Sequence, residues 1–294
     1  MEGCEIFIVG AGAAGLSAAR TAAEQGCRSI VVADWHSKPG GILRQCAHRG
    51  FGAERTGPEY IDQLLADYPD TVQFLWNTAV LSVDESRAAV LSSPECGLKR
   101  IEFRQMILAT GCREIAAGSL GIGGTRPKGI VTAGQLQADM NLKGLKPEGP
   151  VVILGSGDLG LIMARQLAEA GVEIAAIVEK KNSCGGLARN RRCISDFHLR
   201  LVCSASVSQI FGEKSLSGVS IRHANTNAEE FIPCRILLIA VGLLPEQELI
   251  RNLGRPSWLH LCGNCSRIHS IVETVVQEGK QAGIAACEKL RNRL

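Results

Sequence analysis

The fold is decided by the stretch Ile6-Phe-Ile-Val-Gly-Ala-Gly-Ala-Ala-Gly15, close to the start of the chain. An apolar run leads into Gly10-x-Gly12-x-x-Gly15, and small helix-forming residues follow as far as Glu24. This pattern is typical of a buried strand, a tight turn and a helix. Gly10 permits the turn, Gly12 leaves room for a pyrophosphate, and Gly15 permits close packing of helix on strand. The helix N-terminus then favours the phosphates of a dinucleotide.

The same pattern returns at Val151-Val-Ile-Leu-Gly-Ser-Gly-Asp-Leu-Gly160. Asp34 and Glu179 each follow the third glycine of their copy by nineteen residues, where a carboxylate is expected to accept hydrogen bonds from a ribose. Matched positions are separated by 145 residues, as in 155 − 10 and 179 − 34, and the register extends to Gly40-Gly41 and Gly185-Gly186. The chain therefore contains an internal repeat, with one dinucleotide site expected in each copy.

Length and charge limit the possible classes of protein. The 294 residues favour two domains, and 46% apolar residues suffice for two packed cores. A net charge of +3, without a basic run longer than that around Arg189-Asn-Arg-Arg192, does not favour a nucleic-acid partner. We expect that short basic cluster to be a solvated surface.

The expected location is the cytoplasm. Glu2 and Glu5 stand where a signal peptide needs positive charge, and no apolar run reaches the ~18 residues of a membrane span. The 12 cysteines are scattered through a long chain, which favours reduced thiols over a disulfide scaffold.

Further segments are expected from local patterns. A helix is expected over residues 60–68, beginning near Pro58, and a glycine- and proline-rich linker over 112–150, with one short helix near 135–141. Residues 246–253 are predicted to form a helix, and a last helix from about 271 to 293 is expected to return to the first domain.

Three shorter motifs complete a family pattern, namely Ala109-Thr110-Gly111, Ala240-Val241-Gly242 and Gly263-Asn264. Together with the two fingerprints, they resemble the two-dinucleotide-domain flavoproteins, the class of thioredoxin reductase and the pyridine nucleotide-disulfide oxidoreductases. The resemblance implies an α/β fold of two Rossmann-like, three-layer domains, the second inserted in the first. An FAD-binding domain over residues 1–115 and 242–294 and an NAD(P)H-binding domain over 116–241 are implied.

The resemblance also implies the residues of each site. For FAD these are Gly10, Gly12, Ala13, Ala14, Gly15, Asp34, Gly41, Arg44, Gln45, Val80, Ala109, Thr110, Gly111, Gly263 and Asn264. For NAD(P)H they are Gly155, Gly157, Asp158, Leu159, Gly160, Glu179 and Gly242. Glu179 favours NAD(H), since a carboxylate repels the 2′-phosphate of NADP, whereas Lys180 and Lys181 beside it keep NADP open.

A narrower likeness lies in Gly-Gly-x-Leu-x-Gln-Cys-x-His-x-Gly-Phe-Gly at residues 40–52 and Thr-Gly-Pro-Glu-Tyr at 56–60. These stretches are similar to bacterial NAD(P)/FAD-dependent oxidoreductases such as the flavoprotein subunits of opine oxidases, cyanide synthases and glycerol-3-phosphate-type dehydrogenases. The likeness implies a hydride transfer between NAD(P)H and flavin, with a small-molecule substrate or a partner redox subunit, in a homo- or hetero-oligomer.

The sequence also departs from the disulfide reductases. It has neither C-x4-C after Gly40-Gly41 nor C-x-x-C in the second domain. The segment 246–261 is shorter than the family pattern, and Asn264 replaces the usual acid. A non-catalytic nucleotide-binding scaffold subunit is therefore the alternative function.

Two cysteine motifs leave alternatives open. Cys46 and His48 are candidates for thiolate chemistry and proton transfer, or for purely structural roles in their loop. Cys262-Gly-Asn-Cys265 has the spacing of a redox dithiol, and His260 and His269 flank it as zinc ligands would, but it also fits a structural part of the flavin site. No metal is predicted, because a second ligand pair at suitable spacing is missing.

Overall fold

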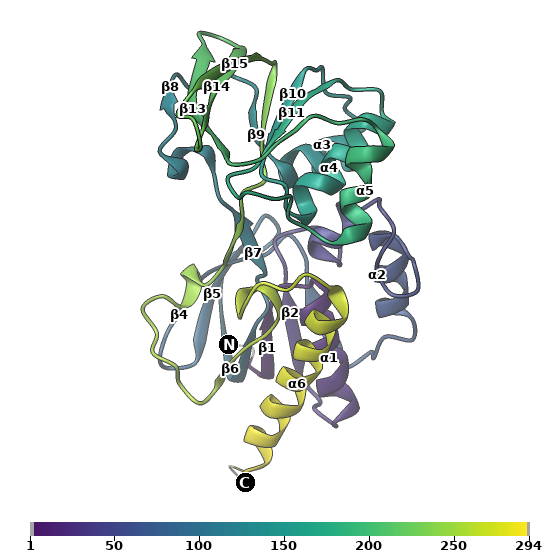
Figure 1. Ribbon diagram of the computed structural model, residues 1–294. Helices are drawn as coiled ribbons and strands as arrows, with labels where there is room; N and C mark the ends of the chain where they lie inside the picture. The colour runs from purple at the N-terminus through teal and green to yellow at the C-terminus, as the bar shows by residue number, and fades with distance from the viewer. Residues whose placement is uncertain (1–2, 293–294) are drawn as a thin grey trace. The chain divides into compact units, whose positions relative to one another are not determined.

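The computed structural model describes residues 3–292 and divides the chain into two units (Figure 1). The first unit comprises the residues up to Arg113 and those from Leu244 onward, and the second unit is Glu114–Leu243. The division expected at residues 115 and 242 falls two residues from the observed one. β7 (Cys112–Glu114) and β17 (Leu243–Pro245), where the chain passes between the units, pair with each other.

The sheet of the first unit runs in the order β3 (Val72–Leu75), β2 (Ile30–Ala33), β1 (Gly3–Val9), β6 (Gly97–Leu108), β5 (Ala88–Ser93) and β4 (Ala79–Val83). β1 is parallel to β2 and β6, whereas β5 is antiparallel to β6. The long strand β6 therefore joins a parallel half to an antiparallel half. Its last residues also pair with β18 (Leu259–Leu261).

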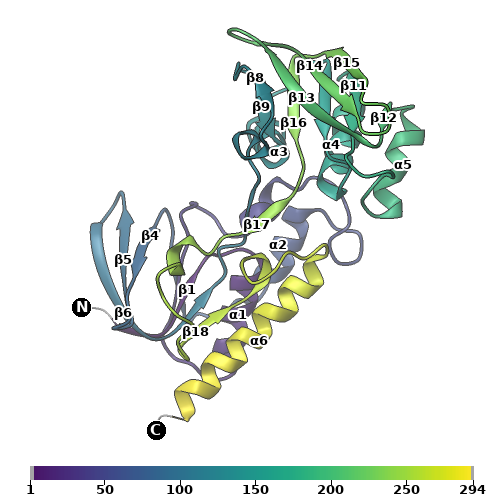
Figure 2. The same ribbon diagram turned by 60° about the vertical axis from the view of Figure 1, so that its left-hand side comes forward.

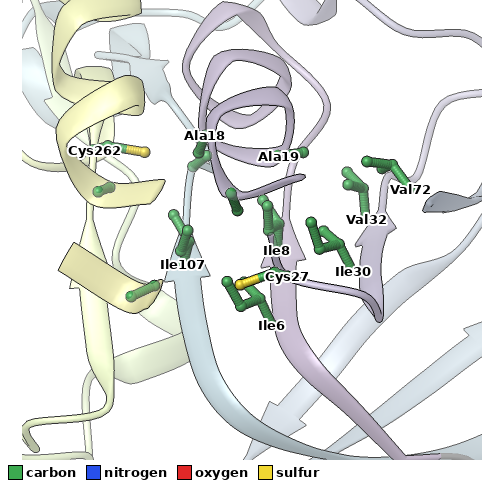
Figure 3. Packing of buried hydrophobic residues seen from close by; sticks show 14 of the residues in the cluster. Ile6, Ile8, Ala18, Ala19, Cys27, Ile30, Val32, Val72, Ile107 and Cys262 are labelled. Atoms are coloured by element: carbon green, nitrogen blue, oxygen red, sulfur yellow. The ribbon is translucent and has the colours of Figure 1, made fainter. Parts of the chain in front are cut away.

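One face of this sheet is covered by α1 (Ala13–Glu24) and α6 (Val272–Arg291), visible side by side in Figures 1 and 2. Figure 3 shows Ile6, Ile8 and Ile107 of the sheet beneath Ala18 of α1. α6 lies so close to α1 that a Cβ at Gly283 would stand 2.6 Å from the carbonyl oxygen of Ala18. The expectation that the last helix returns to the first domain is confirmed.

The remaining helices of the first unit are short. α2 (Gly57–Leu65) begins at Thr56, whose hydroxyl accepts a hydrogen bond from Glu59 N while the Glu59 carboxylate accepts one from Thr56 N. The 3-10 helices are η1 (Gly41–Gln45), η3 (Glu248–Ile250) and η4 (Gly263–Cys265). The helix predicted over 246–253 is wrong, since only η3 forms. Glu246 N donates to Gly111 O at 3.0 Å and Gln247 Nε2 to Cys265 O at 2.5 Å, and these tertiary bonds hold the segment away from a regular helix.

The second unit has a parallel sheet in the order β12 (Leu201–Val202), β11 (Ile174–Val178), β10 (Val151–Leu154), β16 (Ile236–Ile239) and β9 (Ile130–Thr132). The helices α3 (Ala133–Lys143), α4 (Asp158–Glu169) and α5 (Ala188–Asp196) pack on one face. The other face packs on a second sheet, β15 (Glu229–Pro233), β14 (Leu216–His223), β13 (Ala205–Gly212) and β8 (Gly123–Gly124). Three layers result, as expected for a Rossmann-like domain.

The expected linker over 112–150 needs a correction. Besides the expected helix, which is α3, it contains the 3-10 helix η2 (Ala117–Leu120), β8 and β9. β9 hydrogen-bonds along β16, with Ile130 opposite Leu237. Most of this segment therefore belongs to the second unit, and its strands were too short to show a sequence pattern.

Candidate functional site

The first glycine loop connects β1 to α1, and two of its glycines are required by the protein itself. Gly10 has φ +103°, and a Cβ there would overlap the carbonyl oxygen of Ala109. A Cβ at Gly15 would overlap the carbonyl oxygen of Gly10. Ala109, at the end of β6, therefore lies directly against the loop, as the family motif implies. These two glycines fix the turn and the approach of α1 to β1.

Neither backbone conformation nor packing within the protein requires a glycine at position 12. Its φ is −76°, which any residue adopts, and a Cβ there would meet no atom within 4 Å. Gly157 repeats this in the second unit, with φ −68° and open space at the Cβ position. Both glycines therefore leave the backbone open to something outside the chain. These are the positions at which the fingerprint places a pyrophosphate.

The helices that follow these loops are left without side-chain caps. No side chain caps α1 at Gly12 or α4 at Gly157, whereas Thr56 and Thr132 cap α2 and α3. The first N–H groups of an uncapped helix can bind an anion. α5 and α6 also lack a side-chain cap, but α1 and α4 are the uncapped helices that begin at a glycine with open space around it.

Each acidic residue after the second strand holds its own glycine loop. Asp34 is buried and accepts hydrogen bonds from Ala11 N at 2.7 Å and His36 N at 2.8 Å. Glu179, also buried, accepts from Ser156 N at 2.9 Å and Lys181 N at 2.9 Å. Ala11 and Ser156, like His36 and Lys181, are matched positions of the repeat. Carboxylate oxygens have further lone pairs, so both can still accept from a ribose hydroxyl.

The ionisation of Glu179 follows from these bonds. Burial acts to raise its pKa, but the Ser156 hydroxyl, which donates at 2.6 Å, and the two backbone N–H groups outweigh burial and keep the pKa below the usual value. Glu179 is therefore a carboxylate at neutral pH. Ser156 was not among the predicted site residues, although its place in the second fingerprint, matched to Ala11, could have indicated it.

Several other predicted FAD residues gather around the first loop. A Cβ on Gly41 would stand 3.3 Å from the Cα of Gly12, and one on Gly263 would stand 2.8 Å from the Cβ of Ala14. Thr110 and Gly111 continue directly from Ala109. Ala13 lies in the first turn of α1, and Arg44 and Gln45 lie on η1 behind Gly41. Val80 is the exception, since it lies on β4 and packs in the core of the opposite sheet face.

Asn264, which replaces the family's acid, is held by hydrogen bonds. Its Oδ1 accepts from His269 N at 2.9 Å, and its Nδ2 lies 3.7 Å from Cys112 Sγ. The neighbouring Gly263 N donates to Glu278 Oε2 at 2.9 Å. Glu278 thus supplies a carboxylate to this loop from α6. No sequence motif pointed to Glu278.

The remaining NAD(P)H residues surround the second loop. Gly155 and Gly160 must be glycine for the same reasons as Gly10 and Gly15. A Cβ at Gly155 would overlap the carbonyl oxygen of Ala240, and a Cβ at Gly160 would overlap that of Gly155. Asp158 Oδ1 accepts from Leu187 N at 2.7 Å and Asn190 Nδ2 at 2.6 Å, which joins the start of α4 to α5. Leu159 lies in the first turn of α4, and Gly242, with φ +149°, follows β16 and Ala240.

The structure places Cys46 and His48 in the loop after η1. Cys46 is buried and its Sγ lies 3.3 Å from the carbonyl oxygen of Ile42. Burial raises the pKa of the Cys46 thiol to about 12, so it stays protonated at neutral pH and is a poor nucleophile. The His48 ring lies 5.1 Å from the ring of Phe51. These contacts favour a structural role for Cys46, and the catalytic assignments of both residues stay predictions.

Cys262 and Cys265 are fully buried, and burial raises the pKa of both thiols. Cys265 Sγ donates to Leu108 O at 2.9 Å, which fixes η4 at the end of β6. Cys262 packs in the core beneath α1, and Cys265 in the core of the other sheet face. Within residues 3–292, no three acidic, cysteine or histidine side chains are grouped to hold a metal. The contacts favour the structural alternative for this motif.

Comparison with known proteins agrees with this geometry. Residues 4–257 match the family model described as pyridine nucleotide-disulphide oxidoreductase. The chain belongs to this family. It has the mixed α/β fold described above.

Curated relatives of the family include subunits of larger enzymes. The chain is 27% identical over 277 residues to an opine oxidase subunit of Agrobacterium tumefaciens, with 85% of this chain and 54% of the relative covered. It is 32% identical over 178 residues to the HcnB subunit of hydrogen cyanide synthase from Pseudomonas protegens, which covers 58% of this chain and 37% of the relative. The chain thus spans about half, or less, of the length of these relatives.

Solved structures agree in fold. Thioredoxin reductase of T. acidophilum superposes with a TM-score of 0.81 at 20% identity, over 99% of this chain and 100% of the other. Bacillithiol disulfide reductase of Bacillus cereus gives a TM-score of 0.79 at 12% identity, over 100% of both chains. Among the described residues, no helix has the length and apolar character needed to cross a bilayer.

Proposed function

We propose that the first unit binds FAD, that the second unit binds NAD(P)H, and that the protein passes a hydride between the two cofactors. One observation carries this proposal. Gly12 and Gly157 are glycines that the protein needs for neither backbone conformation nor packing, and each stands at the start of an uncapped helix. Bound FAD would supply the hydride-accepting chemistry, while the chain supplies binding and orientation.

The residues present fit an adenine dinucleotide at each loop. Asp34 and Glu179 stand at the edge of their loops, where ribose hydroxyls are expected, and the N–H groups of α1 and α4 stand where phosphates are expected. Gly41 lies against Gly12 and keeps the approach free of a side chain. Asn264 provides an amide in place of the usual acid.

For the second unit, we favour NAD(H) over NADP(H). Glu179 is ionised and held in place by Ser156 and Lys181 N, so it presents a fixed negative charge to the ribose site. A 2′-phosphate would face this charge at close range. Lys180 and Lys181 side chains are exposed beside it and would have to outweigh Glu179 for NADP(H) to bind well.

We further propose that electrons pass between the flavin and either a small-molecule substrate or a partner redox subunit. The support comes from relatives that are enzyme subunits, namely subunits of opine oxidase and hydrogen cyanide synthase. The sequence lacks the cysteine pairs through which disulfide reductases pass electrons, so a different electron acceptor is required.

The test is an anaerobic titration of the purified protein with NADH, followed by the flavin absorption band. We expect the protein to be yellow, or to become yellow when FAD is added, and to bleach on addition of NADH. NADPH at the same concentration should bleach it more slowly. A protein that cannot be reconstituted with FAD would overturn the proposal in favour of the scaffold alternative, for which the short 246–261 segment is the supporting feature.

A matched pair of variants assigns the cofactors to the units. Gly12→Ala should lose FAD affinity while its circular dichroism and unfolding curve stay close to those of the wild type. Gly157→Ala should keep bound FAD and lose reduction by NADH. If either variant retained both properties, the loop concerned would not be the proposed site.

A further inference from the structure

Two buried cysteines far apart in sequence meet in the core of the first unit. Cys27 Sγ and Cys287 Sγ lie 2.8 Å apart, although the residues are 260 positions apart in the chain. Cys27 follows the turn after α1, and Figure 3 shows it beside Ile6 and Ile30. Cys287 lies in α6, one turn before its end. Cys46, Cys262 and Cys265 of this unit have sulfur contacts with carbonyl oxygens, and Cys287 Sγ also lies 3.6 Å from Ala22 O.

We propose that Cys27 and Cys287 form a reversible disulfide that fastens the end of α6 to the turn between α1 and β2. Both residues are free thiols in this structure, so the contact is that of the reduced pair. Their sulfur atoms already touch, and oxidation requires only a small further approach. The two residues are 8% and 2% exposed, so Cys27 is the more accessible residue of the pair.

The surroundings of the pair set which thiol reacts first. The hydrogen bond from Cys287 lowers the pKa of Cys27; burial and the nearby Glu5 oppose this effect, and Arg291 adds to it. The same contact raises the pKa of Cys287. Arg291 is fixed at this end of the helix, where its NH2 donates to Gln25 O at 2.6 Å. Cys27 is therefore the expected nucleophile, since the thiolate is the reactive form.

The oxidant is a small-molecule disulfide. The Cys27 thiolate attacks one of its sulfurs, forms a mixed disulfide and releases one small thiolate, which takes up the proton from Cys287. The Cys287 thiolate then attacks Cys27 Sγ and releases the second small thiolate, which is protonated by solvent with the proton that Cys27 lost. In sum, two protein thiols and one small disulfide give one protein disulfide and two small thiols. Access to Cys27 requires only fraying at the end of α6.

The bond would act on the helix that completes the first glycine loop. α6 packs on α1 through Gly279 and Gly283, and the chain just before α6 brings Gly263 against Ala14. A disulfide at the far end of α6 would restrict separation of the two helices. It would also reduce the conformational entropy of the unfolded chain. We expect the oxidised protein to unfold at a higher temperature and to exchange the amide hydrogens of α6 more slowly.

The experiment uses the whole purified protein incubated with oxidised glutathione. We expect two of the 12 thiols to be lost, a peptide containing Cys27 linked to one containing Cys287 in a non-reducing digest, and a raised thermal midpoint that dithiothreitol reverses. Glutathione bound to Cys27 without a cross-link, a cross-link between other cysteines, or no change in thiol count would each overturn the proposal.

Variants provide matched controls. Cys27→Ser and Cys287→Ser should each abolish the cross-link and the oxidant-dependent rise in thermal midpoint, whereas Cys96→Ser, at an exposed thiol, should keep both. The wild-type peptide map decides the matter even if a variant folds poorly. None of these three residues belongs to the proposed cofactor sites, so the outcome is independent of the proposed function.

Discussion

The two glycine loops share one framework and differ in how it is completed. Gly10 N donates to Ala33 O and Gly155 N to Val178 O, both at 2.8 Å and at matched positions. In the first loop, Gly40 N then donates to the backbone oxygen of Ala11 at 2.8 Å. In the second, the matched Gly185 N donates to the Ser156 hydroxyl at 2.9 Å instead. The second loop thus uses one side chain to join its acid to its double glycine.

The loops differ more after the double glycine. In the first unit, η1 is short and packs on α2, where Gly57 N donates to Cys46 O at 2.8 Å. In the second unit, the chain enters α5, which exposes Arg189, Arg191 and Arg192. The duplicated glycines and acids therefore give both units the same loop structure. The segment after the double glycine differs, so the residues beside the loop differ between the units.

The largest expected effect separates the two kinds of glycine within one loop. Gly15→Ala would drive its Cβ into the carbonyl oxygen of Gly10, and Gly160→Ala would do the same at Gly155. Since backbone must move, we expect each to lower the free energy of unfolding by about 3 kcal/mol or more. Gly12→Ala and Gly157→Ala, with open space around the Cβ, should each lower it by about 1 kcal/mol or less, the cost of alanine in place of glycine at a helix N-cap. Urea unfolding measures all four.

Equal losses at Gly12 and Gly15 would contradict the distinction. They would show that the folded protein itself requires glycine at position 12. The argument for a ligand at that position would then fail, even if Gly15→Ala behaved as expected.

The repeat itself made much of the fold predictable. Two fingerprints and two acids at a constant spacing of 145 residues indicated both Rossmann-like sheets, and the apolar strands β1, β2, β10 and β11 followed from them. The steric tasks of Gly10 and Gly15 are the ones that the motif assigns. These features are local, so that a short stretch of sequence carries the whole signal.

The parts that sequence did not reveal depend on distant contacts. β9 is short and forms along β16, more than a hundred residues later in the chain. Residues 97–100 of β6 are all exposed, and their pairing with β5 shows that the strand begins there. The Glu278 carboxylate accepts a hydrogen bond from Gly263 N, and Gln247 Nε2 donates one to Cys265 O. No rule of sequence spacing predicts these contacts.

The next effect compares the two acids. In Asp34→Asn and Glu179→Gln, an amide replaces a carboxylate that accepts several N–H donors, so each should cost about 1–3 kcal/mol of stability. Glu179→Gln should cost the more, because the Ser156 hydroxyl donates to the Glu179 carboxylate at 2.6 Å, whereas the matching side-chain contact of Asp34, with His36 Nδ1, is longer at 3.1 Å. Thermal unfolding of both variants checks the order. A larger loss for Asp34→Asn would contradict the stronger network assigned to the second loop.

The pH dependence of the second unit follows from the same network. The pKa of Glu179 is lowered in the folded protein, so its contribution to stability is present above the unfolded value of about 4.3 and is lost as pH falls through the lower folded value. Glu179→Gln should remove this part of the acid sensitivity. If the free energies of unfolding of wild type and variant differed by the same amount at every pH from 6 to 3, the assigned role of Glu179 would be wrong.

The smallest effect concerns the segment that only the first loop has. Cys46 would need a thiolate to react, but burial raises its pKa to about 12, so almost none is present up to about pH 9. We therefore expect Cys46→Ser to leave the shape of the pH profile of flavin reduction unchanged, while His48→Gln should remove any step near the ordinary histidine pKa of about 6.5 if His48 transfers a proton. Stopped-flow reduction by NADH measures both profiles. A step lost only in Cys46→Ser would show that the thiol ionises during turnover, and the first loop would then differ from the second in chemistry as well as in shape.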